Sequence, residues 1–211
     1  RAPSYFDVVA YTGNITSGHT INHNLGVVPE MMWVKRRTST DAWKVYHSTL
    51  GNTKYLHLNE TIAAATDSSI WNDTSPTASI FTLGDSNDVN GNGESYIAYL
   101  FASSDVSKVG SYTGNGASDR VIDCGFSNGA RFVLIKDVDT SGTNWQVFDT
   151  TRGLTSTKAE LLRLNLTNAQ IPNGSPTQDY HNLIEPDSSG FKLNNTSALQ
   201  VNASGVNYIF Y

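Results

Sequence analysis

The chain has 211 residues, a formal net charge of −5, 16% charged residues and one cysteine. This length is enough for one large β domain or two small ones. The charge pattern excludes the basic face that nucleic-acid binding requires, because no Lys/Arg run is longer than Lys35-Arg36-Arg37. One cysteine excludes an intrachain disulfide, and no apolar run approaches the length of a membrane span. Neither nucleic acid nor a membrane is therefore an expected partner.

The first half of the chain reads as short strands separated by turn residues. Period-two alternation predicts strands at several places, whereas the nearly continuous apolar run 31–37 predicts a central strand covered on both faces. Gly, Pro and Asn mark the turns between them. The expected strands are residues 6–11, 20–25, 31–37, 43–47, 55–58, 79–83 and 96–101. The evidence for helix is thin: residues 61–67 could make a single turn after Asn59, and the alternative is irregular structure.

The second half repeats the first. Residues 11–14, Tyr-Thr-Gly-Asn, return as residues 112–115, a shift of 112 − 11 = 101. Later blocks match in the same order, up to Tyr96 over Tyr208, and the shift grows only between blocks, where loops are expected. The sequence therefore predicts an all-β chain of two tandem homologous β-sandwich repeats of jelly-roll or lectin-like type, residues 1–103 and 104–211.

Catalytic motifs are missing from the sequence. It contains no Gly-x-Ser-x-Gly, His-Glu-x-x-His, Cys-x-x-Cys or phosphate-binding glycine loop. None of the five histidines recurs in the other repeat, and Cys124 is expected to be a small buried residue. Six acidic residues are scattered and cannot be paired from sequence: Asp7, Glu30, Asp41, Asp73, Asp149 and Glu185. We therefore expect a protein that is not an enzyme and has no catalytic residues.

One segment has the start of a calcium loop. Asp88, Asn90 and Asn92 follow the alternating oxygen ligands of such loops, which would make calcium the cofactor. The twelfth position, however, is Tyr99 in place of a bidentate Glu. The alternative interpretation is a Gly/Asn hairpin turn without a cofactor.

Aromatic side chains are the remaining candidates for ligand contact. Trp43 and Trp145 recur at equivalent positions, which predicts a shared core role. Trp71 lies in a polar stretch and is expected at the surface, so we take Trp71, Asp73 and His181 as the candidate ligand-binding residues.

Residues 6–14, Phe-Asp-Val-Val-Ala-Tyr-Thr-Gly-Asn, and residues 23–35, His-Asn-Leu-Gly-Val-Val-Pro-Glu-Met-Met-Trp-Val-Lys, carry a resemblance. Over essentially its whole length the chain resembles a domain of unknown function in tail and fibre proteins of tailed, marine-type bacteriophages. The resemblance implies a virion protein on the tail or capsid exterior, a piece of a longer chain that contacts other virion proteins. It implies a receptor-binding module that meets a host glycan or protein through its loops, and trimerisation is typical of fibres. The alternatives are a capsid decoration or head-fibre protein and a polysaccharide-degrading tailspike-type domain. The family offers no functional residues to carry over.

Overall fold

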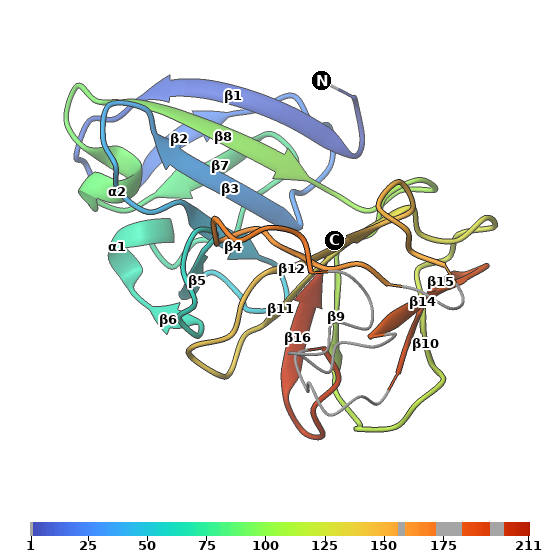
Figure 1. The fold of residues 1–211 in the computed structure, drawn as a ribbon. Helices are drawn as coiled ribbons and strands as arrows, with labels where there is room; N and C mark the ends of the chain where they lie inside the picture. The colour runs from blue at the N-terminus through green and yellow to red at the C-terminus, as the bar shows by residue number, and fades with distance from the viewer. Residues whose placement is uncertain (1, 156–158, 172–182, 195–200) are drawn as a thin grey trace. The chain divides into compact units, whose positions relative to one another are not determined.

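The computed structural model describes residues 2–155, 159–171, 183–194 and 201–211. It divides into two compact units, Arg1–Val109 and Gly110–Tyr211 (Figure 1). The division falls after Val109, whereas the sequence placed it after Ser103. Nearly all regular structure is antiparallel β-sheet, so the prediction of an all-β fold is confirmed.

The first unit is built on a six-stranded sheet with the order β1-β8-β3-β4-β5-β6. Each strand pairs antiparallel with its neighbour, and the long central pairings are those of β8 with β1 and with β3. The strands are β1 (Phe6–Thr12), β8 (Ser95–Phe101), β3 (Met31–Arg36), β4 (Lys44–His47), β5 (Lys54–His57) and β6 (Ala65–Thr66).

A second, two-stranded sheet completes this unit. It pairs β2 (His19–Asn22) with β7 (Ile80–Leu83). The hydrophobic core draws side chains from both sheets and from two short helices, so the two sheets bury their apolar faces against a common core. The buried members of this core are Ile21, Leu25, Met32, Val34, Tyr46, Ile70, Trp71, Phe81, Leu83, Val89, Tyr96, Ala98, Leu100 and Ala102.

The two helices are each one turn long, α1 (Ser68–Trp71) and α2 (Asn87–Asn90). The helical turn expected at residues 61–67 was wrong, because the helix starts only after Asp67. The Asp67 carboxylate accepts a hydrogen bond from the Ser69 amide at 2.9 Å, which makes it the N-cap. Asn72 then takes the left-handed conformation that ends the helix.

The second unit has a five-stranded sheet, β13-β12-β11-β16-β9, and a three-stranded sheet, β10-β15-β14. Its strands are β9 (Gly110–Thr113), β10 (Arg120–Asp123), β11 (Phe132–Asp137), β12 (Gln146–Asp149), β13 (Leu162–Arg163), β14 (Ile184–Asp187), β15 (Gly190–Leu193) and β16 (Asn207–Phe210). Cys124 is buried in its core, as predicted.

Strand order agrees between the units. Counted within each unit, the main sheet runs 1-8-3-4-5 in both, and strands 2 and 7 pair in the smaller sheet of both. The sixth strand differs: it extends the main sheet of the first unit and the smaller sheet of the second. This shared order is what a duplication would produce, and the duplication itself stays a prediction from the sequence.

In the first unit, residues 11–14 (Tyr-Thr-Gly-Asn) pack the end of β1 against the segment that joins α2 to β8. The Tyr11 hydroxyl donates to the Val89 carbonyl at 2.8 Å, and its ring stacks on Tyr96 with centroids 5.1 Å apart. Burial raises the pKa of Tyr11 well above its usual range, which keeps the hydroxyl protonated as a donor. A Cβ atom on Gly13 would lie 2.3 Å from the Gly91 carbonyl oxygen, so only glycine fits.

The second unit contains the same arrangement at β9. Tyr112 donates to the Val201 carbonyl at 2.6 Å and stacks on Tyr208 at 5.1 Å. A Cβ on Gly114 would lie 2.0 Å from the Ala203 carbonyl oxygen. The repeated sequence motif is therefore explained by packing inside each unit.

Candidate binding surface

The main sheet of the first unit carries aromatic rings on the face that turns away from the core. Side chains alternate along β8, so Tyr96, Ala98 and Leu100 enter the core. Tyr99, which lies between them, points to the opposite face and is partly exposed. In the ladder Tyr99 lies opposite Trp33 of β3, so neighbouring strands bring their rings to the same face.

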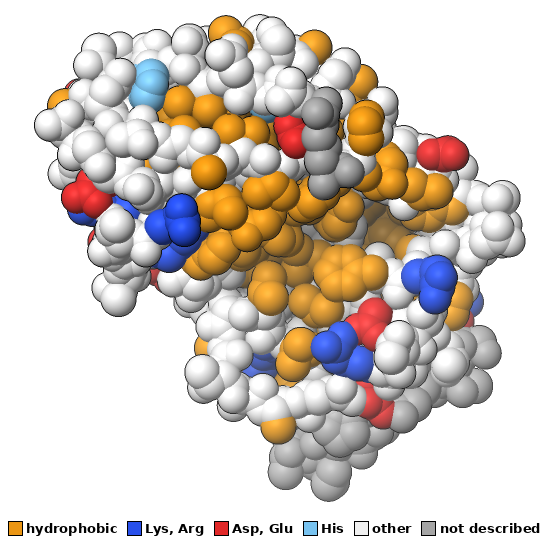
Figure 2. Space-filling model, turned by 90° about the horizontal axis from the view of Figure 1, so that it is seen from above, with side chains coloured by type: hydrophobic (Ala, Val, Ile, Leu, Met, Phe, Trp, Pro, Cys, Tyr) orange, Lys and Arg blue, Asp and Glu red, His pale blue; other side chains and the backbone are white. Residues whose placement is uncertain are grey.

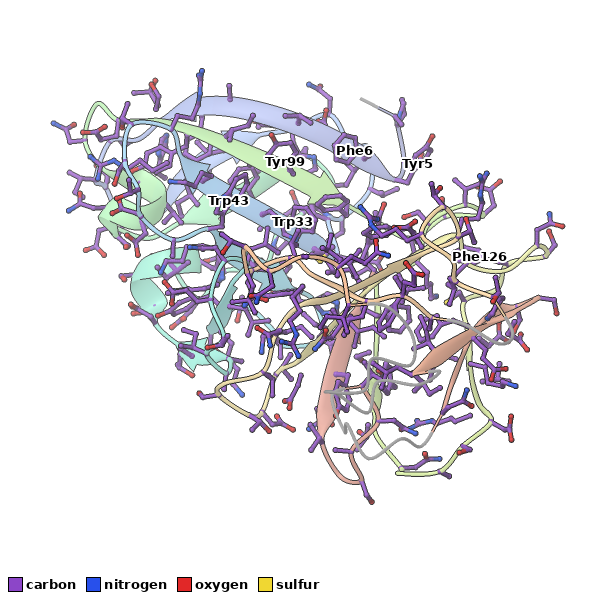
Figure 3. All side chains as sticks on the ribbon, in the orientation of Figure 1. Tyr5, Phe6, Trp33, Trp43, Tyr99 and Phe126 are labelled. Atoms are coloured by element: carbon purple, nitrogen blue, oxygen red, sulfur yellow. The ribbon has the colours of Figure 1, made fainter. Side chains whose placement is uncertain are left out.

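We define the aromatic face as Tyr5, Phe6, Trp33, Trp43 and Tyr99, all partly exposed and all in the first unit (Figure 3). Four of these rings, those of Phe6, Trp33, Trp43 and Tyr99, form a connected series. Phe6 and Tyr99 have centroids 6.4 Å apart, and Trp43 lies 6.0 Å from Tyr99. The buried ring of Phe101 joins Phe6 at 5.3 Å to Trp33 at 4.6 Å.

Hydrophobic side chains gather in one continuous region of the surface in the space-filling view (Figure 2). Val8 on β1, the partner of Tyr99 in the ladder, is 39% exposed. The indole nitrogen of Trp33 is itself buried and makes no hydrogen bond to any residue that the structure describes, so only the ring carbons of Trp33 are exposed. Flat, partly exposed rings of this kind bind the C–H faces of sugars or apolar side chains of a protein partner.

Two sequence predictions about tryptophan were wrong. Trp71 is not at the surface: it is 1% exposed, its indole N–H donates to the Lys54 carbonyl at 3.0 Å, and it meets Tyr46 edge to face at 5.9 Å. The polar residues around it face outward while α1 turns the indole inward. The shared core role holds for Trp145, which is 1% exposed, but not for Trp43, which belongs to the aromatic face.

Of the remaining predicted ligand-binding residues the structure describes only Asp73, which is not part of the aromatic face. Asp73 is exposed next to the C-cap of α1, in a left-handed backbone conformation. Its carbonyl oxygen accepts from the Asn52 side chain at 2.8 Å. His181 lies outside the described residues.

The predicted calcium ligands have three different surroundings. Asp88 pairs with Lys44 at 2.8 Å, and Asn92 is exposed in the turn after α2. Asn90 is fully buried, and its side-chain oxygen accepts from the Asn14 amide at 2.9 Å. Residues 87–90 form a helical turn capped by Ser86, so the alternative prediction of a hairpin turn there was wrong, while calcium binding stays a prediction. Within the described part of the chain, no three His, Cys, Asp or Glu side chains are grouped to hold a metal ion.

A polar cluster lies beneath the main sheet at β4, β5 and α2. Lys44 Nζ is 2.6 Å from His57 Nε2 and 4.7 Å from the Tyr55 ring centroid, and it also forms the ion pair with Asp88. Because the ammonium can only donate, Nε2 accepts, and Nδ1 donates to Glu60 at 2.5 Å. An amine, an imidazole and carboxylates could exchange protons, but Lys44 is buried and its contacts join three elements of the fold. We interpret the cluster as structural.

The acidic residues considered for sugar hydrolysis are engaged separately. Asp7 accepts from the Asn24 amide, Glu30 from the Ser103 amide, and Asp41 pairs with Arg36. In the second unit, Asp149 pairs with Arg152 and Glu185 with Lys192.

Fold and surface together define an all-β protein of antiparallel sheets with an aromatic outer face. The chain belongs to the family described as Domain of unknown function (DUF7483), whose model matches residues 2–211. No curated protein and no solved structure matches the chain. None of the described helices has the length and apolar character needed to cross a membrane.

Proposed function

We propose that this chain is a non-enzymatic attachment module of a bacteriophage virion, and that its aromatic face contacts a glycan or protein on the host cell surface. The single observation that carries the binding role is the series of partly exposed rings on β1, β8 and β3. The assignment to a virion, and the homotrimer that goes with a fibre, are supported by the sequence resemblance to phage tail and fibre proteins.

The aromatic face has the composition of a binding surface. Tyr, Trp and Phe dominate interface energetics because each buries a large area at a small cost in side-chain entropy. Four of its rings are held by contacts with each other or with Phe101, so they are preorganised. A ligand that stacks on them would lose little affinity to reordering of the protein.

The carboxylates favour binding over catalysis. Glycoside hydrolysis requires two carboxyl groups that flank one bond at a defined separation. Asp7, Glu30 and Asp41 instead each hold a different backbone amide or guanidinium of the first unit. This arrangement supports a structural use for the acids.

The test is saturable binding of the full chain to host cells and to an array of bacterial surface glycans, with and without EDTA. We expect Trp43→Ala and Tyr99→Ala each to weaken binding at least tenfold, because truncating a central aromatic anchor costs about 1.4 kcal/mol or more. Val121→Ala is the matched control, since Val121 is an exposed hydrophobic residue of the second unit, on β10. Unaltered thermal unfolding would show that the variants are folded.

Three results would overturn the proposal. If both aromatic variants bind as tightly as the unaltered chain, the aromatic face is not the binding surface. Absence of binding to cells and glycans would favour the capsid decoration alternative, and release of sugar fragments from a host polysaccharide would favour the tailspike-type enzyme. Loss of binding in EDTA would instead add calcium as a cofactor.

A further inference from the structure

A hollow of about 650 Å³ opens on the second unit. It is lined by the start of β11 and the turn after β12. The ladder places Phe132 opposite Asp149, which brings these two segments together. The lining residues are Arg131, Phe132, Asp149, Thr150, Thr151 and Arg152.

The hollow combines two guanidinium groups with one aromatic ring. Phe132 is 45% exposed although it is the first residue of a central strand. Arg131 is exposed, and its side chain has no hydrogen bond or ion pair with the described residues. Arg152 is held in place by Asp149, which is 8% exposed and accepts both from the Arg152 amide at 2.8 Å and from its guanidinium. Arg152 therefore keeps part of its donor fork for a ligand.

The first unit does not have these features at the corresponding positions. There the two arginines and the phenylalanine are replaced by Glu30, Leu50 and Met31. The Glu30 carboxylate accepts a hydrogen bond from the Ser103 amide, while Met31 is buried. The basic and aromatic hollow is thus a property of the second unit and not of the shared scaffold.

We propose that this hollow binds a sugar residue that carries a carboxylate. The inference rests on the proposed function and names the ligand class. Guanidinium groups bind carboxylates through two parallel N–H donors, so Arg131 and Arg152 would take the acid group. The Phe132 ring would pack on the C–H face of the sugar ring, and the hydroxyls of Thr150 and Thr151 would pair with sugar hydroxyls.

The preference for an acid comes from this site and not from the chain as a whole. The net charge of −5 repels anions at long range. Local donors therefore have to supply the affinity, and a ring beside the guanidinium groups favours a carboxylated sugar over free phosphate.

The experiment compares oligogalacturonate with its neutral methyl ester in titration calorimetry on the full chain. The two ligands share their rings and differ in the carboxylates. We expect the acid to bind at least tenfold more tightly than the ester. Arg131→Ala and Phe132→Ala should each remove at least tenfold of this affinity, and Arg131→Lys should restore only part of the loss, because an ammonium lacks the planar fork.

Arg37→Ala is the control, because Arg37 is an exposed arginine of the first unit and its removal changes the net charge equally. The inference is overturned if acid and ester bind alike, if Arg131→Ala matches Arg37→Ala, or if inorganic phosphate displaces the oligosaccharide at equal concentration. Cell binding separates the two proposals: loss in Trp43→Ala with retention in Arg131→Ala would leave the attachment function intact and reject the acidic-sugar site.

Discussion

Asn90 gives the sharpest test of the fold, because two interpretations of this residue predict opposite results. As a calcium ligand it would gain from a negative charge. In the structure its side chain instead makes four hydrogen bonds. It donates to the Thr16 and Gly84 carbonyls at 3.0 and 2.7 Å and accepts from the Asn14 amide and His19 Nδ1, both at 2.9 Å.

The expected cost follows from these bonds. An intramolecular hydrogen bond contributes about 1 kcal/mol net, so Asn90→Ala should lower the free energy of unfolding by about 4 kcal/mol. In a unit of about one hundred residues this corresponds to a melting midpoint lower by about 19 °C. Asn90→Asp should cost at least as much, because a carboxylate oxygen would then face the Thr16 and Gly84 carbonyl oxygens with no proton to donate.

Thermal unfolding followed by circular dichroism measures both effects. It is done once in about 2 mM calcium, a concentration that would fill a loop of this type, and once in EDTA. Asn92→Ala is the matched control, because Asn92 is exposed in the following turn and should change the midpoint little. A midpoint for Asn90→Asp that rises in calcium above that of the unaltered chain would refute the structural interpretation and restore the cation loop.

Three further predictions concern the core and its titration. Trp71→Phe should destabilise the first unit by about 1–3 kcal/mol in chemical denaturation, because it removes the hydrogen bond to Lys54 and leaves a cavity. An unchanged denaturation midpoint would indicate that the indole lies at the surface. Gly13→Ala should destabilise by more than an ordinary surface substitution, since its Cβ would collide with the Gly91 carbonyl; equal stability of the two chains would disprove that close approach. Burial lowers the pKa of Lys136 from 10.5 to about 8, so between these pH values the unfolded chain binds the proton and the folded chain does not. The stability that this group contributes therefore rises by about 3 kcal/mol from pH 8 to 10.5. The free energy of unfolding of the unaltered chain, relative to that of Lys136→Met, should increase by this amount over the same pH range. A difference that does not depend on pH would contradict the lowered pKa.

The sequence predicts most of the strands because their signal is local. Alternation and turn residues placed strands at 43–47 and 79–83, and the structure has them at Lys44–His47 and Ile80–Leu83. The two-residue strand β6 was missed, because Ala65–Thr66 is too short to show any periodicity. The one-turn helices were missed or misplaced for the same reason.

The candidate surface was harder to predict, because burial depends on contacts between distant segments. Trp71 has polar neighbours in sequence, but its own contacts are with Tyr46 and Lys54 on other strands. The run 31–37 predicts cover on both faces, which holds at Met31 and Met32. It fails at Trp33, which points away from the core and is partly exposed although it is as apolar as its buried neighbours. An outward face made of aromatic residues removes the alternation by which an outward face is recognised.

Residues on the two faces of β8 are under different packing constraints. Tyr96, Ala98 and Leu100 are constrained by the interior of the unit, whereas Ile97 and Tyr99, one position away from each, are not. A single strand therefore holds two sets of positions that can change independently of each other. Diversifying only the outward set would give a family of chains with one scaffold and many surface chemistries, without any insertion, deletion or change of loop length.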